Sequence, residues 1–255
     1  MSNRFLRRAG ASVIVQKLTA KAVLERKLIG DGDRVLVAAS GGKDSSVMAW
    51  ALSVLKRALR IDYSLAALHI SSDFCACCKK SVLAARLEEW GVPFTDLSVP
   101  VVGRLKEGRK MNCYWCSTQR RTELIKYALE NGFNKIALGH HLDDIIETFF
   151  MNMTGKGTLS TMPMYLAYRK YPLSLIRPLG YLEERQIIAC AAEQDILKAA
   201  CTCPFGINSR RRVIRDRIAA FTGNSGAVKR RILASLSSGS EDLLTDGGGD
   251  GDETD

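Results

Sequence analysis

The sequence predicts an α/β fold: a doubly wound, mainly parallel sheet with helices on both faces. Short aliphatic runs alternate along the chain with longer segments whose apolar residues recur at helical spacing. A Ser-Gly-Gly turn joins the first strand-like run to the helical segment after it. Strands that alternate with helices need crossover connections and therefore run parallel. The 255 residues suffice for one domain with a full hydrophobic core.

The first 99 residues contain three of these helix and strand pairs. The opening helical segment ends at a Gly-Asp-Gly-Asp sequence, which stops a helix. The run RVLVAAS that follows is short and β-branched, as in a buried strand. Helices are predicted at 12–29, 44–60 and 79–90. Strands are predicted at 34–40, 63–70 and 92–99.

The alternation continues to residue 153 and then loosens. Ser117 is predicted to cap a helix over 117–131, which Gly132 ends. A strand over 135–140 and a helix over 142–153 follow. The remaining segments are predicted as a loop at 155–164, a strand, turn and helix across 174–188, and basic helices across 206–234.

Charge is distributed unevenly along the chain. Lys and Arg number 37 against 27 Asp and Glu, a formal charge of +10. Seven of the acids and no base lie in 241–255, so the preceding residues carry 37 bases against 20 acids, or +17. A body this basic favours a polyanion, most commonly nucleic acid. We expect one domain over 1–236 and an acidic, disordered tail over 237–255, which has few apolar residues.

The cysteine content is high for a chain without an export signal. No apolar stretch reaches the ~20 residues that span a bilayer, and the amino terminus lacks the apolar core of a secretion signal. We therefore expect a cytoplasmic protein with no membrane association. Disulfides are rare in that compartment, so clustered cysteines indicate metal or redox chemistry. The clusters are Cys75/Cys77/Cys78, Cys113/Cys116 and Cys201/Cys203.

The sharpest motif is SGGKDS, between the first strand and its helix. Its glycines let the backbone turn tightly and point successive N–H groups toward an anion. The next helix adds its amino-terminal N–H groups and the positive end of its dipole. The spacing is neither that of a Walker A loop nor G-x-G-x-x-G. The residues of this phosphate loop are Ser40, Gly41, Gly42, Lys43, Asp44 and Ser45.

With its preceding strand, VLVAASGGKDS resembles the pyrophosphate loop of the N-type ATP pyrophosphatases, which have an adenine nucleotide alpha hydrolase-like fold. Those enzymes split ATP between the α and β phosphates and activate an oxygen as its adenylate. The resemblance implies that the phosphate loop holds the pyrophosphate of ATP, with Lys43 and Asp44 acting in catalysis. We place Ala39 and His69 in the same nucleotide site.

A second motif, GHHLDDIIET at 139–148, follows the strand predicted at 135–140. Ligands of open α/β sheets bind beyond the carboxyl ends of strands, so this turn is expected near the phosphate loop, with Gly139 and His140 in the nucleotide site. Asp143 and Asp144 either organise Mg²⁺ on phosphate oxygens or serve as first-turn acids of a helix. With the phosphate loop nearby, we favour a catalytic role. His140 is either an acid–base group or a hydrogen-bonded loop residue.

The third motif is Cys113-Tyr-Trp-Cys116, which is joined much later by Cys201-Thr-Cys203. A C-x-x-C pair with distant thiolates favours a metal site. Zinc would use all four cysteines, whereas a cubane iron–sulfur cluster can use three and leave one iron open to an exogenous sulfur. A redox dithiol and unrelated buried thiols are the other interpretations.

These motifs together resemble a narrower family. The segments MNCYWCSTQRR, GHHLDDIIETFFMNM, IRPLGY and CPFGINSRRRVI closely resemble the tRNA 2-thiolation enzymes of the TtcA/TtuA group, particularly the tRNA 2-thiocytidine synthetase branch. The resemblance covers roughly residues 20–220 by the order of its motifs. In that family three cysteines hold a 4Fe–4S cluster. The resemblance implies Cys113, Cys116 and Cys203 as ligands, with Cys201 as the alternative to Cys203, and a catalytic role for Cys113.

The resemblance implies an ATP-dependent tRNA sulfurtransferase. With ATP and Mg²⁺, it would adenylate the C2 oxygen of a pyrimidine, expected to be cytidine 32 of the anticodon loop, and replace that oxygen with sulfur. A sulfur donor supplied by a cysteine desulfurase and a homodimer are also implied. The alternatives are a lysidine-type adenylating tRNA ligase and a zinc-stabilised RNA-binding module without turnover.

Further residues are expected to contact RNA or to depart from the family. Trp115 or Tyr114 is expected to stack on a base. The cations expected at RNA phosphates are Arg120, Arg121, Arg210, Arg211 and Arg212. The cluster at 75–78 and the acidic tail are not features of the family. We hypothesise that these cysteines bind metal or carry sulfur, and that the tail screens the basic body.

Overall fold

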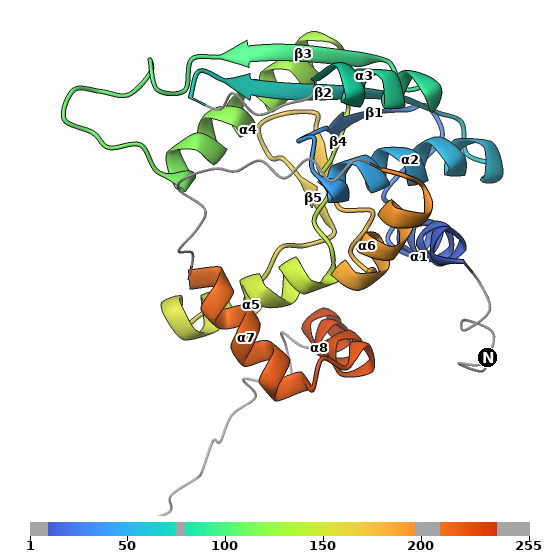
Figure 1. Ribbon diagram of the computed structural model, residues 1–255, viewed down its shortest axis with the longest axis vertical. Coiled ribbons are helices and arrows are strands. Elements are labelled where there is room, and N and C mark those ends of the chain that lie inside the picture. Colours follow the sequence, from blue (N-terminus) through green and yellow to red (C-terminus); the bar gives the residue numbers. More distant parts are fainter. Residues whose placement is uncertain (1–9, 75–79, 197–209, 239–255) are drawn as a thin grey trace, which may run out of the picture.

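The structure, a computed structural model, describes residues 10–74, 80–196 and 210–238. It contains a six-stranded sheet with helices on both faces (Figure 1), which confirms the predicted fold class. The strands are β1 (Asp33–Ala38), β2 (Tyr63–Ser72), β3 (Phe94–Val99), β4 (Lys135–Ala137), β5 (Tyr165–Ala167) and β6 (Ser174–Ile176). The helices are α1 (Ala11–Glu25), α2 (Lys43–Ala58), α3 (Lys80–Glu89), α4 (Cys113–Glu130), α5 (Leu142–Lys156), α6 (Glu184–Glu193), α7 (Arg210–Thr222) and α8 (Gly226–Ser238).

The order of the strands places a ligand crevice between β1 and β4. The sheet runs β3-β2-β1-β4-β6-β5, and every neighbouring pair is parallel except β5 with β6. The chain fills one half of the sheet from β1 to β3 and then crosses to β4, on the other side of β1. Where the strand order reverses, the carboxyl ends of the two strands border an open crevice, and ligands of α/β sheets bind there.

The core has two layers because successive side chains of a strand face opposite sides of the sheet. Val35 and Val37 of β1 belong to the layer that packs against α1, α2 and α6, whereas Leu36 belongs to the layer under α4. Leu36, Ile136 and Leu175 lie in register across β1, β4 and β6. Full burial of each such side chain stabilises the fold by roughly 1.5–3 kcal/mol, so this row holds the three strands together under α4.

Helix α4 begins four residues earlier than the sequence predicted. The Asn112 side chain accepts a hydrogen bond from the Trp115 N–H at 2.9 Å and caps the helix. Ser117, the predicted cap, instead donates from its Oγ to the Tyr114 carbonyl inside the helix. The pair Cys113 and Cys116 therefore lies in the first turn of α4.

The carboxyl-terminal region also differs from the prediction. Strand β5 was not anticipated. The basic helices predicted across 206–234 are confirmed as α7 and α8, which residues 223–225 separate. Figure 1 shows this pair beside α5, away from the strands. Helix α8 ends at Ser238, two residues into the segment predicted as a tail, and residues 239–255 lie outside the described ranges. No helix within those ranges is long and apolar enough to cross a bilayer.

Candidate functional site

The hydroxyl of Ser45 organises the phosphate loop. Its Oγ accepts the Ser40 N–H at 3.1 Å and donates to the Gly42 carbonyl at 3.1 Å. The Gly42 N–H in turn reaches Ser40 Oγ at 3.3 Å. Gly41 has a φ of 79°, a conformation that costs glycine little and other residues more. Ser45 thus shapes the loop, and the amide groups that open α2 lack intrahelical acceptors and can bind an anion.

Gly139 brings the second motif against this loop. A Cβ at Gly139 would lie 3.0 Å from the amide nitrogen of Ser45 and 3.2 Å from the carbonyl carbon of Asp44. Both atoms belong to the backbone, so no flexible side chain could move aside. The absence of a side chain at Gly139 therefore allows the turn after β4 to pack on the start of α2, and the motifs at 40–45 and 139–148 form one site.

Lys43 is a charged partner of two carboxylates. Its Nζ lies 3.1 Å from Asp44 Oδ1 and 2.9 Å from Glu184 Oε1. Burial by itself would lower the pKa of Lys43, but the hydrogen bond to Glu184 and the charge of Asp44 outweigh it, and the pKa is raised. The loop therefore carries a stable cation whose ammonium faces α6.

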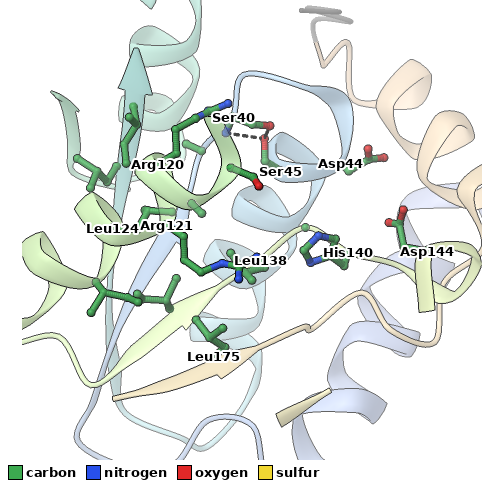
Figure 2. A pocket seen from close by; sticks show the side chains of 18 residues that line it. Ser40, Asp44, Ser45, Arg120, Arg121, Leu124, Leu138, His140, Asp144 and Leu175 are labelled. Atoms are coloured by element: carbon green, nitrogen blue, oxygen red, sulfur yellow. Dashed lines mark hydrogen bonds between the residues drawn. The ribbon is translucent and has the colours of Figure 1, made fainter. Parts of the chain in front are cut away.

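A cavity of about 410 Å³ opens beside the phosphate loop, within the ~300–1,000 Å³ of small-molecule sites. Its floor is apolar and includes Leu68, Ile136 and Leu175 from three strands. In Figure 2, the side chains of α4 approach from one side of the cavity and those of the two motifs from the other. The polar residues that line it are Ser40, Asp44, Ser45, Ser117, Arg120, Arg121, His140 and Asp144.

Two arginines of α4 are available to a ligand in this cavity. Arg120 and Arg121 both line it, and within the described ranges neither forms a hydrogen bond or an ion pair. Arg177, from the IRPLGY segment, differs because it is only 6% exposed and donates to the Pro163 carbonyl. We therefore assign Arg177 to the framework, and the cavity keeps two uncommitted cations on the wall opposite the phosphate loop.

The three histidines of the chain occupy different positions around the site. His140 lines the cavity, and burial lowers its pKa to about 4. His141 is buried and precedes α5, where its backbone N–H donates to Asp144 Oδ2 at 3.2 Å. His69 does not line the cavity: its Nδ1 lies 2.6 Å from the Ala39 carbonyl, which can only accept, so Nδ1 carries the proton. His69 thereby supports the strand that leads into the phosphate loop.

A cluster of carboxylates on α5 and at the start of α6 binds the two basic helices. This acidic cluster consists of Asp143, Asp144, Glu147, Glu183 and Glu184. Its partners from α7 are Arg211, 3.2 Å from Asp144, and Arg215, 2.6 Å from Glu147. Those from α8 are Lys229, 2.6 Å from Asp143, and Arg230, 3.2 Å from Glu183. Because a buried carboxylate without a cation is strongly destabilising, these pairs fix α7 and α8 against the site.

Asp143 and Asp144, predicted to act together, have different surroundings. Asp144 lines the cavity, and its Oδ1 faces Arg211. Asp143 does not line it: its two oxygens accept from Lys229 Nζ at 2.6 Å and from the Glu184 N–H at 2.7 Å. Burial would raise the pKa of Asp143, but these hydrogen bonds outweigh it and lower the pKa.

The cysteine pair of α4 adjoins the cavity. Cys113 is exposed and Cys116 is half-buried, and they lie one turn apart on the helix, immediately before the cavity residue Ser117. The third predicted ligand, Cys203, its alternative Cys201, and the cysteines at 75–78 lie outside the described ranges. Within those ranges, no group of three or more His, Cys, Asp or Glu residues could hold a metal ion.

The aromatic residues between the two cysteines also differ in role. Trp115 is half-buried in the layer under α4, and its Nε1 donates to the Val101 carbonyl at 3.0 Å. Tyr114 is 80% exposed. Of the two candidates for stacking on a base, Trp115 is therefore committed to the core, and Tyr114 is accessible.

The strand reversal, the phosphate loop beside it and the second motif packed on that loop define a nucleotide-binding α/β domain of the PP-loop class. The family model described as PP-loop domain matches residues 13–220. A protein of Geobacter metallireducens named tRNA-cytidine(32) 2-sulfurtransferase is 35% identical over 221 residues, 85% of this chain and 86% of its own. One of the same name from Syntrophotalea carbinolica is 37% identical over 74% of each chain. The chain belongs to the PP-loop domain family, on the branch of the tRNA 2-thiolation enzymes.

Solved structures support the fold. The U34-tRNA thiolase NcsA from Methanococcus maripaludis, solved with its [4Fe-4S] cluster, superposes with a TM-score of 0.73 at 22% identity, over 88% of this chain and 77% of that one. NMN synthetase from Francisella tularensis superposes with a TM-score of 0.52 at 15% identity, over 87% and 91% of the two chains. The architecture is therefore shared by enzymes whose names describe different reactions.

Sequence reasoning missed Glu147, Glu183 and Glu184. Glu184 pairs with Lys43 across 141 positions, and Glu147 pairs with Arg215 across 68. For Glu183 and Glu184 the sequence offered one signal, because acids at the start of the helix after the last strand lie at the carboxyl edge of the sheet. Their partners had no local signature.

Proposed function

We propose that this protein is an ATP-dependent tRNA sulfurtransferase that converts cytidine 32 of the anticodon loop into 2-thiocytidine. Relatives named tRNA-cytidine(32) 2-sulfurtransferase, at 31–37% identity, support this proposal. One structural observation carries it: the phosphate loop and the helix that bears Cys113 and Cys116 border the same cavity. A nucleotide in that cavity would meet both groups.

The reaction needs two bond exchanges, because a C2 carbonyl oxygen is a poor leaving group. The C2 oxygen attacks the α phosphorus of ATP, an O–P bond forms, and pyrophosphate leaves. Hydrosulfide then attacks C2, the C–O bond breaks, and AMP leaves with that oxygen, while the proton from sulfur goes to solvent. No electron is gained or lost when the sulfur enters as sulfide.

The phosphate loop supplies the electrostatic part of the first exchange. Backbone N–H groups of the loop and of the start of α2 bind the departing pyrophosphate, and Lys43 balances its charge. Asp44 and Asp144 are carboxylates on the cavity wall, an oxygen donor set that suits Mg²⁺. Mg²⁺ there would neutralise phosphate oxygens. Asp143 is assigned a positioning role, because both its oxygens are engaged by Lys229 and Glu184.

A 4Fe–4S cluster is proposed to be held by Cys113, Cys116 and Cys203. The first two fit this role, because they lie one turn apart at the start of α4, just before the residues of that helix that line the cavity. When bound by three thiolates, the cluster supplies an iron position at which a sulfide can be held. The cap at Asn112 fixes the first turn of α4 and hence the direction of the two described thiols.

The RNA contacts are proposed to divide between the cavity and the outer surface. Arg120 and Arg121 meet phosphates of the target nucleotide, and Tyr114 stacks on a base. Arg211 was predicted from the sequence to contact RNA phosphates, but its guanidinium is paired with Asp144 and Glu147. The exposed cations of α7 and α8 that have no ion pair within the described ranges are Arg212, Arg217 and Arg231.

We further propose a cytoplasmic homodimer that receives its sulfur from a donor supplied by a cysteine desulfurase. The proposed division of the chain is a domain over 1–236 and an acidic tail over 237–255, with the qualification that α8 reaches Ser238.

The test is anaerobic reconstitution of the full chain with iron and sulfide, followed by incubation with ATP, Mg²⁺, sulfide and tRNA. Mass spectrometry of the digested nucleosides is expected to show 2-thiocytidine, with one AMP and one pyrophosphate per sulfur. Lys43→Met is expected to abolish pyrophosphate release, and Cys113→Ser to abolish sulfur insertion. RNA-dependent turnover with no sulfur in any nucleoside would favour another adenylating tRNA ligase.

A further inference from the structure

The ammonium of Lys43 has a carboxylate partner from a distant part of the chain. Glu184, the first residue of α6, places Oε1 2.9 Å from Lys43 Nζ. The two side chains are only 23% and 30% exposed. At this degree of burial a charge-assisted hydrogen bond is directional and stronger than one in water. The pair therefore determines where the Lys43 ammonium lies beside the phosphate loop.

The other oxygen of Glu184 faces α7. Arg215 Nη1 lies 3.6 Å from Glu184 Oε2, and Arg215 Nε donates to Glu147 Oε1 at 2.6 Å. The side chain of Glu147 is only 2% exposed, so its charge requires a cation, and Arg215 is nearer to it than its second partner, Arg211, at 3.9 Å. Arg215 is thereby held in place by one carboxylate while it faces the other.

The backbone of Glu184 is fixed as well. Its N–H donates to Asp143 Oδ2 at 2.7 Å, and the other Asp143 oxygen is taken by Lys229 of α8. Glu184 is thus held by α5 through its backbone and by α7 through its side chain. None of Lys43, Glu184 and Arg215 lines the cavity, and Glu184 reaches the phosphate loop through the Lys43 ammonium.

We propose that Glu184 is the positioning residue for Lys43 and that Arg215 holds Glu184 in the orientation this requires. Helix α7 then belongs to the machinery that uses ATP, because one of its side chains determines where the phosphate-loop cation lies. The proposal rests on the proposed function only in taking ATP as the substrate. It does not depend on which nucleoside is modified or on the metal centre.

The test combines one measurement on Lys43 itself with one on turnover. The reactivity of Lys43 toward an amine-selective reagent is followed against pH by mass spectrometry in the full-length protein, without nucleotide or RNA. In Glu184→Gln the carboxylate charge is lost, and the labelling profile is expected to move to lower pH. The kcat for pyrophosphate release from ATP is expected to fall about tenfold or more, with KM for ATP changing about threefold or less.

Variants of α7 and α8 separate this role from general helix docking. Arg215→Gln is expected to reproduce part of both effects, and Arg215→Lys to restore them. Arg230→Gln is the matched control, because it removes an ion pair between α8 and the buried Glu183 that does not involve Lys43. It is expected to leave the labelling profile and kcat unchanged.

Three results would overturn the proposal. The first is a Lys43 labelling profile that does not move in Glu184→Gln. The second is faster turnover with tighter ATP binding in that variant, which would make Glu184 a competitor of the phosphates. The third is an equal loss in Arg230→Gln and Arg215→Gln. If the labelling shifts as expected but no nucleoside gains sulfur, the proposed function fails and the positioning role stands.

Discussion

The burial of His140 makes the stability of the fold depend on pH. Its Nδ1 is buried without a hydrogen-bond partner in the described part of the chain, and burial lowers its pKa from 6.5 to about 4. Between those two values the unfolded chain binds a proton that the folded chain does not, so the free energy of unfolding falls on acidification. The contribution of His140 to the free energy of unfolding is therefore fully present above about pH 6.5, where the ring is neutral in both states. It is lost as the pH falls toward 4.

We expect His140→Asn to lose this dependence. The wild-type protein should lose roughly 1–3 kcal/mol more stability than the variant between about pH 7.5 and pH 4.5. Urea denaturation at a series of pH values measures the difference, and the comparison of slopes removes any constant cost of the substitution. Parallel stability curves for the two proteins would show that His140 titrates normally in the folded state.

The close approach at Gly139 leaves no room for a side chain. A Cβ in Gly139→Ala would press on the backbone of Asp44 and Ser45, at 3.2 and 3.0 Å, and shift the phosphate loop. We expect a stability loss of about 1–3 kcal/mol and ATP affinity about tenfold lower or worse, measured by calorimetry. The control is Gly30→Ala, where the new Cβ meets nothing nearer than the Asp33 carboxylate at 3.9 Å. Equal ATP affinity in the two variants would contradict the close approach.

The sequence predicted those parts of the site that are local in the chain. The phosphate loop was recognisable because its glycines, lysine and serines are consecutive between a strand and a helix. The second motif was placed correctly because parallel strands end at one edge of a sheet. Glu184 was not found because it meets Lys43 across 141 positions, and no short-range pattern encodes such a pair. The different surroundings of Asp143 and Asp144 were not predictable for the same reason, because Lys229, which binds Asp143, lies 86 positions away in the sequence.

At the scale of elements, α4 determines where the cysteine pair lies. The Asn112 side chain satisfies the Trp115 N–H in the first turn, so Asn112→Ala should cost about 1 kcal/mol and loosen the turn that carries Cys113 and Cys116. We expect reduced iron content after anaerobic reconstitution, whereas Asn112→Asp keeps a capping oxygen and should retain it.

A matched change at the other end of α4 controls for stability. Asn131 follows the helix, and its Nδ2 donates to the Tyr127 carbonyl at 2.9 Å. Asn131→Ala should also cost stability but leave the iron content unchanged, because it is a whole helix away from the cysteines. Full iron content in Asn112→Ala would show that the Asn112 cap is not needed for the cysteine pair to bind iron.

The elements that the sequence missed share a physical reason. Strand β5 has three residues, all exposed, at the antiparallel edge of the sheet, so it shows no apolar alternation. The start of α4 was missed because Ser117 was predicted as the capping residue, although Asn112 is itself a good capping residue. The longer helices and central strands were predicted because each buries a regular apolar face in one of the two core layers.

At the scale of the whole molecule, the basic charge serves two purposes. The acidic cluster forms ion pairs inside the protein with four of the cations: Arg211, Arg215, Lys229 and Arg230. The total charge therefore overstates how many cations of α7 and α8 face a polyanion. Composition alone predicted a nucleic-acid partner, but only the ion pairs show which cations remain available.

The acidic tail is expected to weaken the binding of RNA. Residues 241–255 carry seven acids and no base, and they follow α8, which itself carries Lys229, Arg230 and Arg231. A tethered segment acts at a high effective concentration, so these carboxylates should compete with RNA phosphates for the same cations. Deletion of 241–255 raises the formal charge from +10 to +17. We expect tRNA binding to tighten roughly threefold to tenfold at about 50 mM salt, and the gain to vanish near about 300 mM as screening increases.

Fluorescence anisotropy with labelled tRNA measures this, and a variant of equal length with all seven acids changed to Asn or Gln separates charge from bulk. Because the competition is electrostatic, that variant should bind as tightly as the deletion does. Tighter binding in the deletion alone would assign the effect to excluded volume. Equal affinity of all three proteins at low salt would mean that the tail leaves the RNA-binding cations accessible.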